Sequence, residues 1–139
     1  MRVCILGEGL VSLTLAKALI NQGIYVDYLS DQKGFKVNKS RTIGISKVNL
    51  EFLNKNIIDL NKLTWTINKI EIYTDNLNKD KILEFKKANQ NLFSIIKNYE
   101  LYYYLISTVK TNRFFKNIKH VKFDIKNYNL VINCGSKNF

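Results

Sequence analysis

A glycine turn between an apolar run and a helical pattern is the feature that most constrains this fold. The stretch "RVCILG" is apolar after its arginine, as is typical of strands buried in a parallel sheet. Gly7 and Gly9 follow, and apolar residues then recur at helical spacing until Gly23, where a left-handed helix cap fits. A second strand-like run, "IYVDYLS", completes a strand–helix–strand pattern within about 30 residues. The sequence therefore predicts a βαβ unit built on a parallel sheet.

The turn has the spacing of a dinucleotide-binding fingerprint, G-x-G-x-x-G, with one substitution. Gly7 allows a tight turn and Gly9 lets a pyrophosphate approach the backbone, while Ser12 replaces the third glycine. The first helical turn, formed by Leu10, Val11 and Ser12, would offer its N–H groups to the phosphates. Because the third glycine serves helix packing, we expect serine to be tolerated there. The alternative, two chance glycines before an ordinary buried helix, stays open.

The fingerprint also requires an acidic residue at the end of the second strand, which accepts hydrogen bonds from the ribose. Ser30 occupies that position, and Asp31 lies one residue beyond it. Ser30 would bind the ribose without the roughly 1.5–3 kcal/mol of a charge-assisted hydrogen bond. Asp31 would take the role instead if the strand is one residue longer. Both alternatives remain at this stage.

Length and composition indicate one globular domain. The 139 residues are 46% hydrophobic and include no proline, which excludes a disordered or Pro-rich linker. No apolar run reaches the roughly 20 residues that span a bilayer, and Glu8 interrupts the N-terminal run without a signal-peptide cleavage site after it. We therefore expect a cytoplasmic protein without a transmembrane segment, although a peripheral membrane contact stays open.

The charge and the rare residue types argue against other classes of site. The net charge is +11, but only three of the 22 basic residues are arginine, which favours compositional bias over selected nucleic-acid binding. Cys4 and Cys134 both lie in apolar runs, where cysteine acts as a small buried hydrophobe. His120 is the only histidine and no C-x-x-C pair exists, so a metal site is not expected.

The rest of the chain alternates between strand-like and helical patterns. Residues 31–46 are predicted as a loop, 47–60 and 98–112 as helices, and Asn98 as an N-cap. Trp65 is expected in the core, and the basic residues of the stretch 110–126 are expected on a solvated face. Strands are predicted over residues 64–75, 81–85, 91–97, 120–125 and 128–135. The single domain 1–139 would thus comprise a nucleotide-binding unit (1–60), further strands (61–97), and a helix with returning strands (98–139).

Four segments carry a resemblance to a known family. They are, in order, "SRTIGIS", "NKIEIYTDN", "IIKNYELYYYL" and "YNLVINCGSKNF". Together with the glycine turn they resemble the N-terminal part of FAD-dependent aromatic-ring monooxygenases, especially the ubiquinone-biosynthesis hydroxylase type. The resemblance implies a Rossmann-like FAD/NAD(P)-binding fold with strands from an incomplete substrate region. It also implies NAD(P)H as the reductant and a small aromatic or quinone-like substrate.

Carried over residue by residue, the resemblance implies a set of FAD contacts. Gly7 and Gly9 would hold the FAD pyrophosphate, Ser30 stands where a ribose-binding glutamate is expected, and Arg41 matches the family arginine near the flavin. A guanidinium fork suits a phosphate or a flavin-side contact. A solvated loop arginine is the alternative for Arg41.

The sequence also departs from the family pattern. Tyr99 replaces an FAD-contacting arginine, and Cys134-Gly135-Ser136 replaces Ala-Asp-Gly. The second flavin motif, Gly-Asp, would lie beyond Phe139, so the chain corresponds to about a third of such an enzyme. We therefore expect weak or absent FAD binding and no hydroxylase activity from this chain alone, and we assign no catalytic residue. The alternatives are a non-catalytic nucleotide-binding relative that acts through a protein partner, and a basic nucleic-acid or membrane-surface module.

Overall fold

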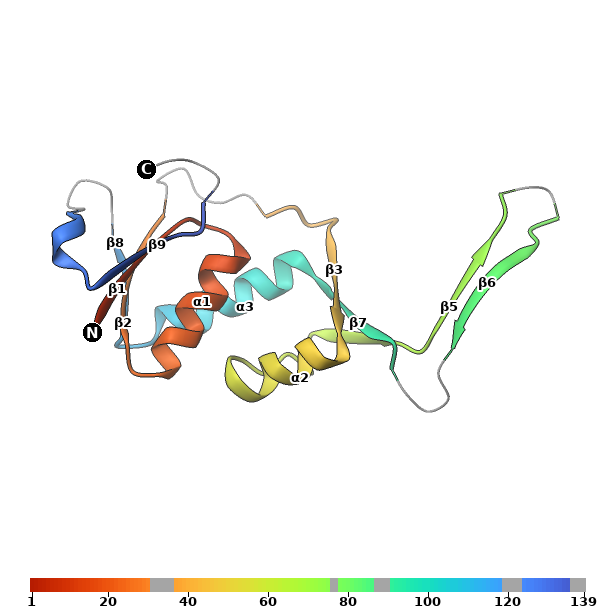
Figure 1. The fold of residues 1–139 in the computed structure, drawn as a ribbon, viewed down its shortest axis with the longest axis horizontal. Coiled ribbons are helices and arrows are strands. Elements are labelled where there is room, and N and C mark those ends of the chain that lie inside the picture. Colours follow the sequence, from red (N-terminus) through yellow and green to blue (C-terminus); the bar gives the residue numbers. More distant parts are fainter. Residues whose placement is uncertain (31–36, 76–77, 87–90, 119–123, 136–139) are drawn as a thin grey trace.

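A four-stranded parallel sheet organises the protein. The computed structural model describes residues 1–30, 37–75, 78–86, 91–118 and 124–135. The sheet has the order β8-β2-β1-β9, with every neighbouring pair parallel (Figure 1). Its strands are β1 (Arg2–Leu6), β2 (Tyr25–Leu29), β8 (Phe115–Ile118) and β9 (Leu130–Asn133). β2 and then β8 follow β1 on one side, and β9 lies beside β1 on the other. Numbered by their order along the chain, the four strands are arranged 3-2-1-4, as in dinucleotide-binding folds. The predicted α/β fold with a parallel sheet is confirmed.

Two helices cover one face of this sheet and form the main core with it. The α-helices are α1 (Leu10–Asn21), α2 (Lys47–Asn56) and α3 (Asn98–Lys110). Figure 1 shows α1 and α3 on the same side of the sheet. Side chains alternate along β1, so that Val3 and Ile5 pack in the cluster that contains Leu13 of α1 and Leu105 of α3. All four are completely buried.

The opposite face of the sheet is covered partly by the connection between β8 and β9. Cys4, Leu6 and Leu29 form a second buried cluster there, against which Tyr128 packs. The Tyr128 hydroxyl donates a 3.0 Å hydrogen bond to the carboxylate of Asp27 on β2. This contact ties the short 3-10 helix η2 (Ile125–Asn127) and the start of β9 to the sheet.

The strand predicted over 120–125 is corrected in its last two residues. Asp124 caps η2, because its side chain accepts a hydrogen bond from the Lys126 N–H, and Ile125 begins that helix. Residues 120–123, with His120, lie outside the described part of the chain. The prediction of a solvated face for the basic residues of 110–126 is confirmed for Lys110, Arg113 and Lys116, whose side chains are exposed. Part of the stretch nevertheless forms β8, an edge strand of the sheet.

A long insertion between β2 and α3 forms a second, antiparallel sheet. Its order is β3-β7-β4, with strands β3 (Thr42–Ser46), β4 (Thr64–Ile67) and β7 (Phe93–Lys97). The prediction of a loop over 31–46 is therefore wrong for its last five residues. Only five residues are extended there, and their hydrogen-bonding partner β7 is about 50 residues away along the chain.

The residues predicted as one strand over 64–75 form two strands in different sheets. After β4 the chain enters a hairpin of β5 (Lys69–Tyr73) and β6 (Lys81–Lys86), which projects from the body in Figure 1. One hairpin face carries the apolar cross-strand pairs Ile70–Phe85 and Ile72–Leu83. Trp65 on β4 is 48% exposed, so its predicted core position is wrong. The Lys97 ammonium lies 5.0 Å from the centre of the Trp65 ring, a cation–π contact.

The helix ends follow their local sequence signals in part. Gly23 has a φ of +72° directly after the end of α1, as predicted for a left-handed cap. Ser46 caps α2 by accepting a hydrogen bond from the Asn49 N–H. Asn98 is not the cap of α3, because Lys97 holds that position and the backbone N–H of Asn98 donates to the carbonyl of Arg41. Within the described residues, no helix combines the length and apolar character needed to cross a bilayer.

Candidate functional site

Gly7 forms the turn at the carboxyl end of β1 and contacts the chain that leaves β9. Its φ is +128°, a conformation that L side chains rarely adopt. A Cβ at Gly7 would lie 3.0 Å from the Gly135 nitrogen and 3.1 Å from the Cys134 carbonyl carbon. The Gly7 N–H also donates to the Leu29 carbonyl at the end of β2. The turn therefore lies where the connections of the parallel sheet diverge, which is where such sheets bind ligands.

Gly9 leaves open space in front of the first turn of α1. A Cβ built on Gly9 would meet no atom of a described residue within 4 Å. Gly9 is the N-cap of α1, no side chain caps the helix, and the first turn contains no acidic residue. The N–H groups of Leu10, Val11 and Ser12 have no intrahelical partners, as in the first turn of any α-helix. This arrangement can bind an anion through backbone N–H groups and the positive end of the helix dipole.

Ser12 points away from that open space and into the core. Its side chain is completely buried, and its hydroxyl lies 2.8 Å from the Gly9 carbonyl oxygen and 3.2 Å from the Tyr28 hydroxyl on β2. Burial is the main factor that raises the pKa of the Tyr28 phenol well above its usual range. Tyr28 was missed by the sequence reasoning, and its only signal was a polar hydroxyl in an otherwise buried strand.

The position expected to bind ribose contains a neutral pair. Ser30 directly follows β2, and its hydroxyl donates a long, 3.4 Å hydrogen bond to the Asn117 side-chain carbonyl on β8. Asn117 was not predicted as a site residue. Asp31, the alternative ribose ligand, lies outside the described residues. The described residues at this end of the sheet therefore present neutral hydroxyl and amide groups to a ligand.

Arg41 lies just before β3 and is exposed. Its backbone carbonyl accepts a 2.9 Å hydrogen bond from the Asn98 N–H, which joins the start of β3 to the start of α3. Its guanidinium forms no salt bridge with any described residue. The side-chain oxygen of Asn98 is buried and accepts no hydrogen bond within the described ranges. Tyr99, where the resemblance leads one to expect an arginine, donates to the Glu100 carboxylate and adds no positive charge.

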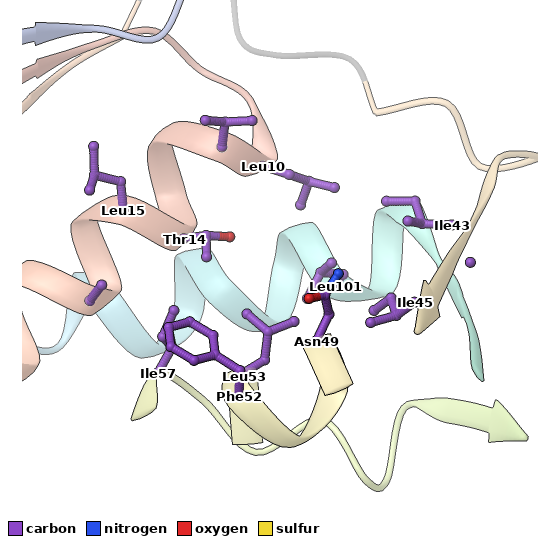
Figure 2. A pocket seen from close by; sticks show the side chains of 13 residues that line it. Leu10, Thr14, Leu15, Ile43, Ile45, Asn49, Phe52, Leu53, Ile57 and Leu101 are labelled. Atoms are coloured by element: carbon purple, nitrogen blue, oxygen red, sulfur yellow. The ribbon is translucent and has the colours of Figure 1, made fainter. Parts of the chain in front are cut away.

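An apolar groove connects the glycine turn with the Arg41 segment. It encloses about 610 Å³ between α1, β3 and α2 (Figure 2). Leu10 and Val11 from the first turn of α1 line one side, and Ile43, two residues after Arg41, lines another. The remaining lining residues are Thr14, Leu15, Ala18, Gly44, Ile45, Asn49, Phe52, Leu53, Ile57 and Leu101. The structure thus brings Leu10 and Val11 close to the segment that follows Arg41.

The described cysteine and acidic residues do not indicate a reactive thiol or a metal site. Burial, with a smaller contribution from the charge of Asp27, raises the pKa of the Cys4 thiol to about 11. Burial also raises the pKa of Cys134. Both thiols therefore stay protonated at neutral pH, in keeping with a packing role. Among the residues with described positions, no three His, Cys, Asp or Glu side chains are grouped to hold a metal.

Several solved monooxygenase structures share this fold. The 2,6-dihydroxypyridine-3-hydroxylase from Arthrobacter nicotinovorans matches 84% of the chain with a TM-score of 0.61 and 16% identity. The p-nitrophenol 4-monooxygenase from Pseudomonas putida matches 84% with a TM-score of 0.66 and 14% identity. A probable FAD-dependent monooxygenase from Pseudomonas aeruginosa matches 91% with a TM-score of 0.65 and 13% identity. At these identities the likeness shows the fold.

The chain is much shorter than these structures. It covers 28%, 31% and 36% of their respective lengths. No protein-family model matches the sequence, and no curated protein matches it at a significant level. The structural likeness therefore supports the part of the family resemblance that concerns the fold.

Proposed function

We propose that this chain forms the FAD-pyrophosphate-binding part of a flavin-dependent monooxygenase that acts on an aromatic ring. The observation that carries the proposal is the open space at Gly9 in front of an uncapped helix N-terminus with no acidic residue in its first turn. Gly7, Gly9 and the N–H groups of Leu10, Val11 and Ser12 would hold the pyrophosphate. Bound FAD would supply the redox chemistry, and this chain would bind and orient it.

The remaining described groups fit the same ligand. Arg41 has no salt-bridge partner in the described part of the chain, and its segment leads into the groove shared with Leu10. A guanidinium there would add a charge-assisted contact to a phosphate. The Asn98 side-chain oxygen offers a buried acceptor to a ligand hydroxyl. Ser30, with Asp31 as the alternative, would bind the adenosine ribose.

The finer identity rests on the resemblance in the four sequence segments. It supports a quinone precursor as the substrate and NAD(P)H as the reductant. Two of the proteins with solved structures are named for other compounds, 2,6-dihydroxypyridine and p-nitrophenol. We therefore propose the quinone-precursor class from the sequence motifs, and the monooxygenase class from the motifs together with the fold.

An FAD titration of the 139-residue protein tests the proposal. We expect saturable but weak binding, in the micromolar range or weaker, with ADP as a competitor and no hydroxylase activity from this chain alone. Arg41→Gln should weaken FAD binding roughly three- to tenfold, because one exposed charge-assisted hydrogen bond is lost. Quenching of flavin fluorescence and the ligand-dependent shift in Tm provide two independent readouts.

Lys39→Gln is the matched control for this titration, because it removes an exposed positive charge two residues from Arg41. We expect it to change FAD affinity less than twofold at physiological salt. Equal losses in the two variants would mean that only net charge matters at this site. If neither FAD nor ADP binds at millimolar concentration, the proposal is wrong.

The groove supports a second candidate function, the binding of a protein partner. Val11 and Phe52 line it and are 70% and 57% exposed. Exposed apolar patches of this kind are typical of protein interfaces. The helices α1 and α2, which flank the groove, together contain three lysines (Lys17, Lys47 and Lys55) and one carboxylate, Glu51. Since the whole chain has a net charge of +11, the partner that fits is an acidic protein with apolar anchors.

Site-specific photocross-linking tests this candidate in the cells that naturally make the protein. A photoreactive residue in place of Phe52 should give one discrete adduct with an acidic protein. The same residue in place of Tyr103, which is 54% exposed on α3 but does not line the groove, should not. Val11→Lys combined with Phe52→Lys should abolish the partner complex. Equal adducts at both positions, or none, would contradict a specific partner.

A further inference from the structure

A chain of two hydrogen bonds links β2 to the glycine turn. The Ser12 hydroxyl donates to the Gly9 carbonyl oxygen at 2.8 Å and lies 3.2 Å from the Tyr28 hydroxyl. A serine hydroxyl has one proton, and here Gly9 accepts it. The second contact must therefore run from the Tyr28 O–H to the Ser12 oxygen. The direction of the chain is Tyr28 to Ser12 to Gly9.

The last bond in this chain holds the peptide unit that opens the helix. The Gly9 carbonyl also accepts the first intrahelical hydrogen bond, from the Leu13 N–H at 3.2 Å. A trans peptide unit is planar, and its C=O and N–H groups point in opposite directions. When Ser12 and Leu13 hold the Gly9 carbonyl toward the helix, the Leu10 N–H points out of the N-terminal end of the helix, as the N–H groups of a first helical turn do. The hydroxyl of Ser12 thus orients one of the donors of the candidate anion site.

Packing holds Tyr28 in place for this role. Its side chain is 2% exposed, and its ring centre lies 5.6 Å from that of Phe115 on β8. Because burial raises the phenol pKa, Tyr28 keeps its proton at any physiological pH and remains a donor. A buried Ser12 without this donor would have an unsatisfied lone pair at the helix–sheet contact.

We propose that Tyr28 is a positioning residue for the nucleotide site, acting through Ser12 on the Gly9–Leu10 peptide unit. The inference rests on the proposed function, since the ligand is the pyrophosphate of FAD or ADP. Ser12, which replaces the third glycine of the fingerprint, then contributes to the site by orienting this peptide unit. The Tyr28 hydroxyl touches no ligand and affects binding only by orienting the Leu10 N–H.

A double-mutant cycle on ADP affinity tests the inference. Tyr28→Phe and Ser12→Ala should each weaken ADP binding about three- to tenfold, measured by isothermal titration calorimetry. The double variant should lose no more than Ser12→Ala alone, because Tyr28 acts only through Ser12. Tyr25→Phe is the matched control, since Tyr25 lies on the same strand but is 49% exposed. It should leave ADP affinity unchanged.

The amide resonance of Leu10 provides a readout that needs no ligand. In ¹⁵N-correlated spectra of the free protein, Tyr28→Phe should shift the Leu10 amide, and Tyr25→Phe should not. If Tyr28→Phe lowers Tm but leaves both this resonance and ADP affinity unchanged, the role of Tyr28 is only structural. Additive losses in the cycle would also overturn the inference. If the unmodified protein binds no ADP, the proposed function fails, whereas the Leu10 response still decides whether Tyr28 orients this peptide unit.

Discussion

Gly7→Ala is expected to lower the free energy of unfolding by about 3 kcal/mol. Two costs add at this position. The φ of +128° is strained for any residue with a Cβ, and the new methyl group would lie 3.0 Å from the Gly135 nitrogen and 3.1 Å from the Cys134 carbonyl carbon. Both of these are backbone atoms, so neither can rotate out of the way. Urea denaturation followed by circular dichroism measures the loss.

Gly23→Ala is the control that separates the cost of backbone strain from the cost of a steric clash. Gly23 also has a positive φ, of +72°, but a Cβ there would meet no atom of a described residue within 4 Å. We expect a loss of only about 1 kcal/mol, from backbone strain alone. Equal losses for the two variants would show that the contact between the turn and the end of β9 contributes nothing.

Gly9→Asp is expected to change stability and binding in opposite directions. Aspartate is a better N-cap than glycine by a few tenths of a kcal/mol, and the space around Gly9 accepts a side chain. Its carboxylate would, however, accept hydrogen bonds from the N–H groups that a phosphate needs, and would repel the phosphate. We expect ADP and FAD affinity to fall on the order of 100-fold, or about 2.7 kcal/mol, with Tm unchanged or slightly higher.

Gly9→Ala distinguishes the charge of the aspartate from its size. Alanine places only a methyl group in the open space and cannot cap the helix. We expect it to weaken ADP binding by less than Gly9→Asp does, because it neither competes for the N–H groups nor repels the phosphate. If Gly9→Asp left ADP affinity intact, the pyrophosphate would have to bind elsewhere. That result would also contradict the proposed function.

The parts of the fold predicted correctly are those whose signals are local. The first βαβ unit follows from an apolar strand, two glycines and a helical repeat that ends at Gly23, all within 30 residues. β3 and β8 were missed because glycine, polar or charged residues interrupt them, Gly44 in β3 and Lys116 with Asn117 in β8. Trp65 was placed in the core from its apolar character alone, although on β4 its ring is half exposed beside Lys97. Which face of a strand is buried depends on tertiary packing, which this sequence pattern does not encode.

The candidate site was likewise predicted only where its signals are local. Gly7 and Gly9 were identifiable from spacing, because a tight turn and an open helix N-terminus have strict backbone requirements. The contributions of Tyr28 and Asn117 were not, since each depends on which residue of another element the fold brings next to Ser12 or Ser30. Asp31 stays a prediction, because it lies outside the described residues.

The contact between Gly7 and Gly135 has a consequence for synthesis on the ribosome. β1 is translated long before its neighbour β9 and the chain that packs on the Gly7 turn, because most of the described chain lies between them. At about 5–20 residues per second, the 100 or so residues between β2 and β9 take roughly 5–20 s. Throughout that interval one edge of β1 has no strand to pair with. The nascent chain is therefore exposed to aggregation or chaperone capture until translation reaches β9.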